Sequence, residues 1–161
     1  MHHRHRRFFA DHLCNFMPHS LFMAITRGDI NTVQKYINSN QNDRHRMNAR
    51  TFTTSLTPLM LAVRTQQFAI VEMFLANNLT DVNFCNGNGK SAISIAILEN
   101  NYKLICLLLA DPRINLQGIH SKILEWAVSN GHDHIVTQLT QSADAQICVN
   151  HQLSFNGMHG C

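Results

Sequence analysis

The chain has 161 residues, of which 45% are hydrophobic, so it can bury the core of one domain without a stapling metal. A formal net charge of +3 is too small to indicate nucleic-acid binding by itself, and five widely separated cysteines argue against a disulfide framework or a zinc finger. No apolar run approaches the roughly 20 residues that span a bilayer, so we expect a cytoplasmic protein with reduced thiols.

The first predicted element is a basic, histidine-rich arm over residues 1–18, which we expect to be partly disordered. It carries Arg4, Arg6 and Arg7. The opening Met-His-His places His3 third after a free amine, an arrangement that can hold square-planar Cu(II) or Ni(II) through nitrogen atoms. A reducing cytosol offers little Cu(II), so we interpret the arm as a His-rich start without a metal role, and we expect no cofactor.

Four segments then repeat one pattern of apolar residues. Aligned on one alanine each, they agree again nine residues later at Val or Ile, and twelve residues later at Tyr, Phe or Leu. The anchors are 38, 34 and 31 residues apart by subtraction of their numbers. The pattern predicts two amphipathic helices in each unit, with a polar turn between them. The anchors are Ala24, Ala62, Ala96 and Ala127.

The ends of these helices are also predicted by the sequence. Thr57 is placed to cap a helix and Pro58 to occupy its first position, where a missing N–H costs nothing. The fourth unit has Lys122-Ile123 at this point, so we expect its first helix to begin irregularly. Gly tolerates the positive φ of a tight turn and Asn is the next best residue. The turns are predicted at Arg27-Gly28-Asp29, Arg64 to Gln67, Asn100-Asn101 and Asn130-Gly131-His132, and a hairpin-like finger at Asp81 to Ser91.

Several of these stretches match parts of one known repeat. They are TPLMLA from Thr57, GHDHIV from Gly131, DVN from Asp81 and GNGKSAISIA from Gly87. The chain thus resembles the ankyrin repeat family over about residues 20–140. The resemblance implies an all-α solenoid of helix-turn-helix units joined by hairpin-like fingers. It places the ankyrin-repeat domain at 19–149, with units near 20–52, 53–86, 87–118 and 119–142, and a flexible tail at 150–161.

By resemblance, ankyrin stacks bind another protein through a concave face made of finger tips and inner helices. We therefore expect a non-catalytic, monomeric protein-interaction scaffold, and the sequence lacks the common phosphate-loop, nucleophile-elbow and metalloprotease motifs. Register selects the candidate contact residues. On the inner helices they are Thr26, Arg27, Arg64, Thr65, Leu98, Glu99, Ser129 and Asn130, and on the fingers Thr54, Leu56, Asn88, Lys90, Ile119 and Ser121.

The alternative is a binder of nucleic acid or anionic membrane that uses the N-terminal arm and the 38–55 loop. This loop carries Arg44, His45, Arg46 and Arg50, which either form a basic finger for an acidic partner or stay solvated. No nucleic-acid module accompanies the charge, so we favour a protein partner. Short, Asn-rich ankyrin proteins are also similar to those that intracellular bacteria and large viruses direct at host proteins, so a pathogen effector in host cytoplasm is a further expectation.

Overall fold

The computed structural model describes residues 16–137 and 139–140 of the chain. The predictions for most of the basic arm, His3 included, and for the tail at 150–161 lie outside these residues. The chain forms two compact units, residues 1–115 and residues 116–161, which we call unit 1 and unit 2 and describe separately.

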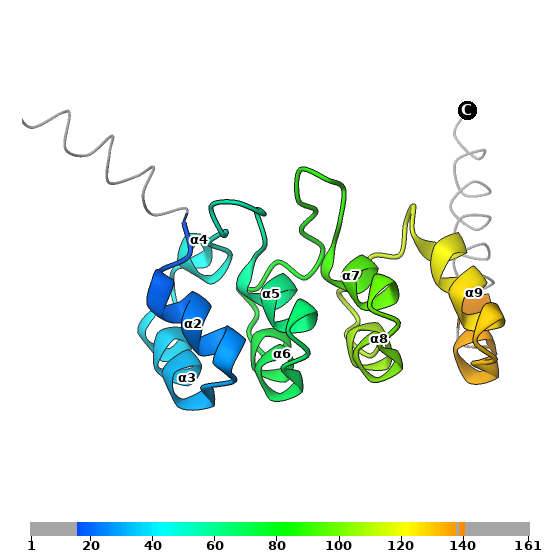
Figure 1. Cartoon of the computed structure of the whole chain (residues 1–161), viewed down its shortest axis with the longest axis horizontal. Helices are drawn as coiled ribbons and strands as arrows, with labels where there is room; N and C mark the ends of the chain where they lie inside the picture. The colour runs from blue at the N-terminus through cyan, green and yellow to red at the C-terminus, as the bar shows by residue number, and fades with distance from the viewer. Residues whose placement is uncertain (1–15, 138, 141–161) are drawn as a thin grey trace, which may run out of the picture. The chain divides into compact units, whose positions relative to one another are not determined.

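Unit 1 is built from two layers of helices (Figure 1). In the inner layer, α5 packs between α2 and α7, and in the outer layer α6 packs between α3 and α8. The one β-interaction among the described residues is an isolated bridge between Phe16 and Arg50, so the prediction of an all-α fold is confirmed. The helices are α2 (His19–Arg27), α3 (Ile30–Ser39), α4 (Arg44–Met47), α5 (Pro58–Arg64), α6 (Phe68–Leu75), α7 (Ala92–Leu98) and α8 (Tyr102–Leu109).

The alanine anchors of the sequence repeat mark the point where each inner helix ends. The Ala24 carbonyl accepts a hydrogen bond from the N–H five residues later, at 2.8 Å, and the same bond recurs from Ala62 at 2.9 Å and Ala96 at 3.1 Å. In each turn the next carbonyl along the chain accepts a second N–H, at 3.0 to 3.2 Å. These two bonds form the Schellman motif, which satisfies the last carbonyls of a helix and reverses the chain. The repeat in the sequence is therefore a repeat of one turn geometry.

Each turn in unit 1 needs one residue with positive φ. Gly28 has φ of 74° and Asn100 has φ of 50°, as the sequence predicts for Gly and Asn. In the second turn this residue is Gln66, with φ of 57°, although Gln has neither the freedom of Gly nor the short polar side chain of Asn. The second turn is therefore more strained than the other two, in which Gly and Asn occupy this position.

Side chains cap most helices of unit 1, as predicted for Thr57, whose Oγ1 accepts the Met60 N–H at 3.3 Å. In the third repeat, Ser91 takes the place of Thr57 and forms a reciprocal capping box with Ser94. Asp29 caps α3 and Asn101 caps α8. At the equivalent position before α6, Gln67 provides no side-chain cap, so no side chain bonds the first N–H groups of α6 as Asp29 and Asn101 do for α3 and α8.

The segment between α3 and α5 differs from the predicted long loop. Its middle is the helix α4, which holds Met47 in the core, and the Tyr36 hydroxyl donates to the Arg46 carbonyl at 2.8 Å. The Asn48 side chain then joins this segment to the next repeat of unit 1. It donates to the Leu79 carbonyl at 2.8 Å and accepts the Asp81 N–H at 2.7 Å. Residues Arg44 to Arg46 therefore lie on a short helix with exposed side chains, where the sequence predicted a loop.

Unit 2 contains α9 (His120–Ser129) and a second helical stretch at 133–137 and 139–140. Gly131, with φ of 68°, turns the chain between them, and the His132 N–H donates to the anchor Ala127 carbonyl at 2.9 Å. The residue before α9 is Ile119, which offers no side-chain cap. Ser121 lies inside α9 and so does not cap it. The expected irregular start is therefore observed, since no hydroxyl caps this helix.

Candidate partner-binding surface

The inner helices of unit 1 expose four of the predicted contact residues beside their turns. Arg27 lies at the end of α2, Arg64 at the end of α5, and Leu98 and Glu99 at the end of α7. Leu98 is 64% exposed, which is unusual for a large aliphatic side chain on a packed helix. Thr26 is half-buried, and its hydroxyl donates to helix carbonyls of its own turn at 3.0 Å. The Arg and Leu side chains therefore dominate this part of the surface.

Thr65 behaves like Thr26, because its hydroxyl donates to the Leu61 carbonyl at 2.9 Å and its side chain is half-buried. Both threonines bond to their own helices. They can contribute methyl contact area to a partner, whereas their hydroxyls are already used.

The first finger, residues 50–56, is closed by Thr51. Its hydroxyl accepts the Leu56 N–H at 3.0 Å and lies 2.8 Å from the exposed Thr54 hydroxyl. Leu56 itself is only 3% exposed, so the prediction that it contacts a partner is wrong. It directly precedes the N-cap Thr57, and an apolar residue at this position anchors the chain entering a helix.

The second finger, residues 81–91, is closed by Asn86. Its buried side-chain oxygen accepts the N–H groups of Asn88 and Lys90, both at 3.0 Å, while its own N–H donates to the Lys90 carbonyl at 2.9 Å. The predicted contact residues Asn88 and Lys90 are exposed at the tip. The Asn86 amide also donates to the Thr54 carbonyl at 3.4 Å, which joins the two fingers.

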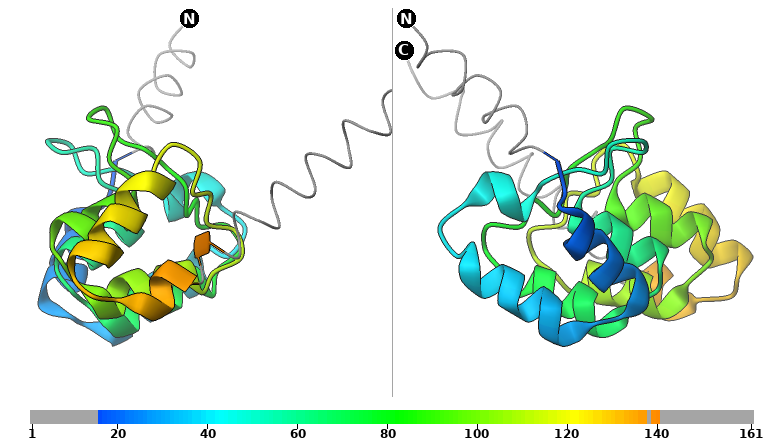
Figure 2. Two further views of the ribbon diagram at one scale, coloured as in Figure 1. Left: turned by 90° about the vertical axis from the view of Figure 1, so that its right-hand side faces the viewer. Right: turned by 60° about the vertical axis from the view of Figure 1, so that its left-hand side comes forward.

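The two fingers project from the inner layer of unit 1, on the side away from α6 and α8 (Figures 1 and 2). A second contact between them is made by the Arg50 guanidinium, whose Cζ lies 5.7 Å from the centre of the Phe84 ring. These two contacts hold the fingers together on this side of unit 1.

The remaining predicted contact residues belong to unit 2. Ser121 and Ser129 are exposed on α9, and Ile119 is half-buried just before it. The exposed Asn130 donates from its side chain to the Trp126 carbonyl at 2.8 Å, so it terminates α9. The Trp126 ring lies 4.8 Å from the ring of His132, which gives this turn an aromatic contact.

Sequence reasoning missed two residues of the finger region. Phe52, at the tip of the first finger, is 82% exposed, and the 43% exposed Phe16 lies against it with ring centroids 5.3 Å apart. A signal was present in the sequence, because Phe52 is the one apolar residue in the run from Thr51 to Ser55.

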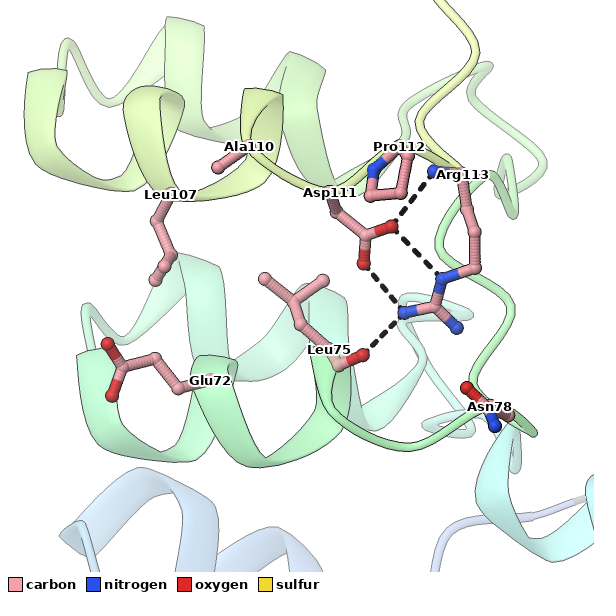
Figure 3. Close-up of a pocket in the computed structure, with 8 residues that line it drawn as sticks. All are labelled: Glu72, Leu75, Asn78, Leu107, Ala110, Asp111, Pro112 and Arg113. Atoms are coloured by element: carbon pink, nitrogen blue, oxygen red, sulfur yellow. Dashed lines mark hydrogen bonds and ion pairs between the residues drawn. The ribbon is translucent and has the colours of Figure 1, made fainter.

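A groove of about 440 Å³ lies on the outer layer, lined by residues of α6, α8 and the segment after α8 (Figure 3). At its edge, Arg113 donates to both carboxylate oxygens of Asp111, at 3.0 and 2.6 Å. The same guanidinium donates to the carbonyls of Leu75 and Asn77 at the end of α6. Hydrogen bonds from Arg113 hold the pKa of Asp111 below its ordinary value. Arg113 and Asp111 therefore join two neighbouring repeats within unit 1.

Among the described residues, no three His, Cys, Asp or Glu side chains are grouped so that they could hold a metal ion. Cys85 is exposed and Cys106 is half-buried, and neither is in a disulfide in the part of the chain that the structure describes. Within this part of the chain no helix has the length and apolar character needed to cross a membrane.

Comparison with protein families matches residues 21–118 to a model described as ankyrin repeats (3 copies). The chain belongs to the ankyrin repeat family. The match covers the three helix pairs of unit 1, and ankyrin repeats generally mediate protein–protein interaction. No curated protein matched the sequence.

Proposed function

We propose that this ankyrin repeat protein is a non-catalytic scaffold that binds a partner protein through the fingers and inner helix ends of unit 1. The observation that carries the proposal is the exposed set Arg27, Arg64, Leu98 and Glu99, held on the rigid inner layer. Leu98 supplies apolar contact area, and the charged residues around it supply orientation and selectivity. Protein interfaces commonly combine these two features.

The helix pair of unit 2 extends this proposal. We propose that it is a fourth ankyrin repeat, supported by the hydrogen bond from His132 to the Ala127 carbonyl and by the positive φ of Gly131. Ser129 and Asn130 occupy the same register there as Arg64 and Thr65. A partner that also contacts unit 2 would meet a polar, uncharged helix end.

The alternative of nucleic-acid or membrane binding through the 38–55 loop finds less support. Arg46 forms an ion pair with Asp43 at 3.3 Å, which reduces what this side chain offers to phosphates.

The test is a pull-down from lysate at low and at high salt, using the wild type and the double variant Arg64→Glu with Leu98→Asp. The matched control is Ile30→Asp with Lys35→Glu, which makes the same two kinds of change on the exposed surface of α3 in the outer layer. We expect the first variant to lose partners that the control retains, with modest dependence on salt. Retention of every partner by the inner-layer variant would show that this surface is not the binding site.

A further inference from the structure

The exposed aromatic pair of the finger region is held in place by the backbone. The Met17 N–H donates to the Arg50 carbonyl at 2.8 Å, next to the bridge between Phe16 and Arg50. This contact fixes the segment before α2 against the base of the first finger, and it brings the ring of Phe16 to that of Phe52 at an interplanar angle of 51°. Two rings from distant segments are thus presented to solvent together, so little side-chain ordering is needed when a partner covers them.

The same surface has an excess of positive charge. Arg50 and Lys90 lie on the fingers, and Arg64 lies on the inner helix between them. In the part of the chain that the structure describes, the ion pairs are Arg46 with Asp43 and Arg113 with Asp111, so these three cations have no carboxylate partner there. The acidic residues of this surface are Glu99 and, at the start of the second finger, Asp81, so the cations outnumber them.

We propose that the partner presents an acidic segment carrying an aromatic or long aliphatic side chain, with the apolar side chain on Phe16 and Phe52 and the carboxylates on Arg50, Lys90 and Arg64. This inference rests on the proposed function and specifies its partner. Aromatic anchors dominate the affinity of many protein interfaces, and complementary charge directs association and selects the partner.

Two other occupants fit the observations less well. The chain's own N-terminal arm carries Arg4, Arg6 and Arg7, whose charges have the same sign as those of the fingers, which disfavours the arm as the occupant. Single-stranded nucleic acid could stack on the rings, but strong backbone binding uses a longer row of phosphate contacts than the four cations Arg27, Arg50, Arg64 and Lys90 provide, and Glu99 and Asp81 lie among them. Charge and apolar area together favour an acidic protein segment.

The test is selection of random displayed peptides on the full-length protein, followed by fluorescence anisotropy of the enriched peptides. We expect these peptides to be net acidic and to contain an aromatic or long aliphatic residue. Phe52→Ala should weaken their binding about tenfold or more, and Lys90→Glu should weaken it about fivefold. The matched controls are Thr53→Ala, beside Phe52 on the same finger, and Lys35→Glu on the outer layer, and both should bind within about twofold of the wild type.

Three results would overturn the proposal. The first is enrichment of neutral or basic peptides, or binding that Phe52→Ala leaves unchanged. The second is displacement of the peptides by a synthetic peptide of residues 1–15, which would make the arm the occupant. The third is a labelled oligothymidylate that binds at the same residues more tightly than the enriched peptides do.

The proposed function fails separately from this inference. Peptides without acidic residues that lose affinity only with Arg64→Glu and Leu98→Asp would remove the acidic-segment proposal and leave the inner surface as a protein-binding site. Peptides that are insensitive to every finger and inner-helix variant would remove both.

Discussion

Replacement of Arg113 by Met tests how neighbouring repeats of unit 1 are joined. The Arg113 guanidinium reaches the C-terminal end of α6 and also pairs with Asp111, whose side chain is only 9% exposed. Methionine keeps much of the length and apolar stem of Arg and removes every one of these hydrogen bonds. The variant therefore leaves an almost buried carboxylate without its cation and removes the Arg113 donor from the Leu75 carbonyl.

We expect Arg113→Met to lower the free energy of unfolding by about 2–3 kcal/mol at pH 7. Loss of hydrogen bonds to a charged group accounts for about 1.5–3 kcal/mol, and stranding a fully buried charge would cost about 3–5 kcal/mol. The lower range applies because the Arg113 side chain is 33% exposed and water screens part of the interaction. Adding Asp111→Asn to Arg113→Met should restore a large part of the loss, because the stranded charge is then absent.

The assay is urea unfolding followed by circular dichroism, with Lys103→Met on the exposed surface of α8 as the control for loss of one cation. The pH dependence gives a second readout. The pKa of Asp111 is lower in the folded protein, so its contribution is present above the ordinary carboxyl pKa and is lost as the pH falls through the lowered value. The difference between wild type and Arg113→Met should therefore shrink in acid.

Two results would refute this reasoning. One is a cost below about 0.5 kcal/mol, the range of an ordinary surface substitution. The other is a double variant with Asp111→Asn that is no more stable than Arg113→Met alone.

Four further substitutions test the turns, caps and fingers by the urea midpoint, with an unchanged m-value required in each case. Gln66→Gly should stabilise the protein by about 0.5–1 kcal/mol by relieving positive φ, whereas Gly28→Ala should destabilise it by about 1 kcal/mol; equal signs would contradict the strain argument. Gln67→Asp should add about 0.5–1 kcal/mol by capping α6, and no gain would mean that the orphan N–H groups already have partners. Asn86→Ala should cost about 1–2 kcal/mol through two backbone N–H groups of the finger.

The fold was predictable because the repeat recurs in residues whose roles are local. An alanine at the helix end, a polar turn and a capping hydroxyl each need only a few neighbouring residues, so Thr57, Gly28 and Asn100 could be interpreted from the sequence. The position of α4 could not, because its four residues contain one apolar side chain and depend on tertiary contacts of Met47 and Asn48. A segment so short has no detectable periodicity.

The surface was predictable only in part, for a similar reason. Register assigns a residue to a face of a helix, which is how Arg64 and Leu98 were selected. In a finger no such period exists, so Leu56 was placed on the surface while Phe52 was overlooked. Which of these two is buried is decided by the Thr51 hydrogen bonds that close the finger, and these join residues through loop geometry.

Amide hydrogen exchange of the protein with and without its captured partner tests the central claim most directly. The account predicts slower exchange in the fingers, residues 50–56 and 81–91, and at the ends of α5 and α7, with no change in α3, α6 and α8. Protection confined to the outer helices, or to the groove beside Arg113, would contradict it.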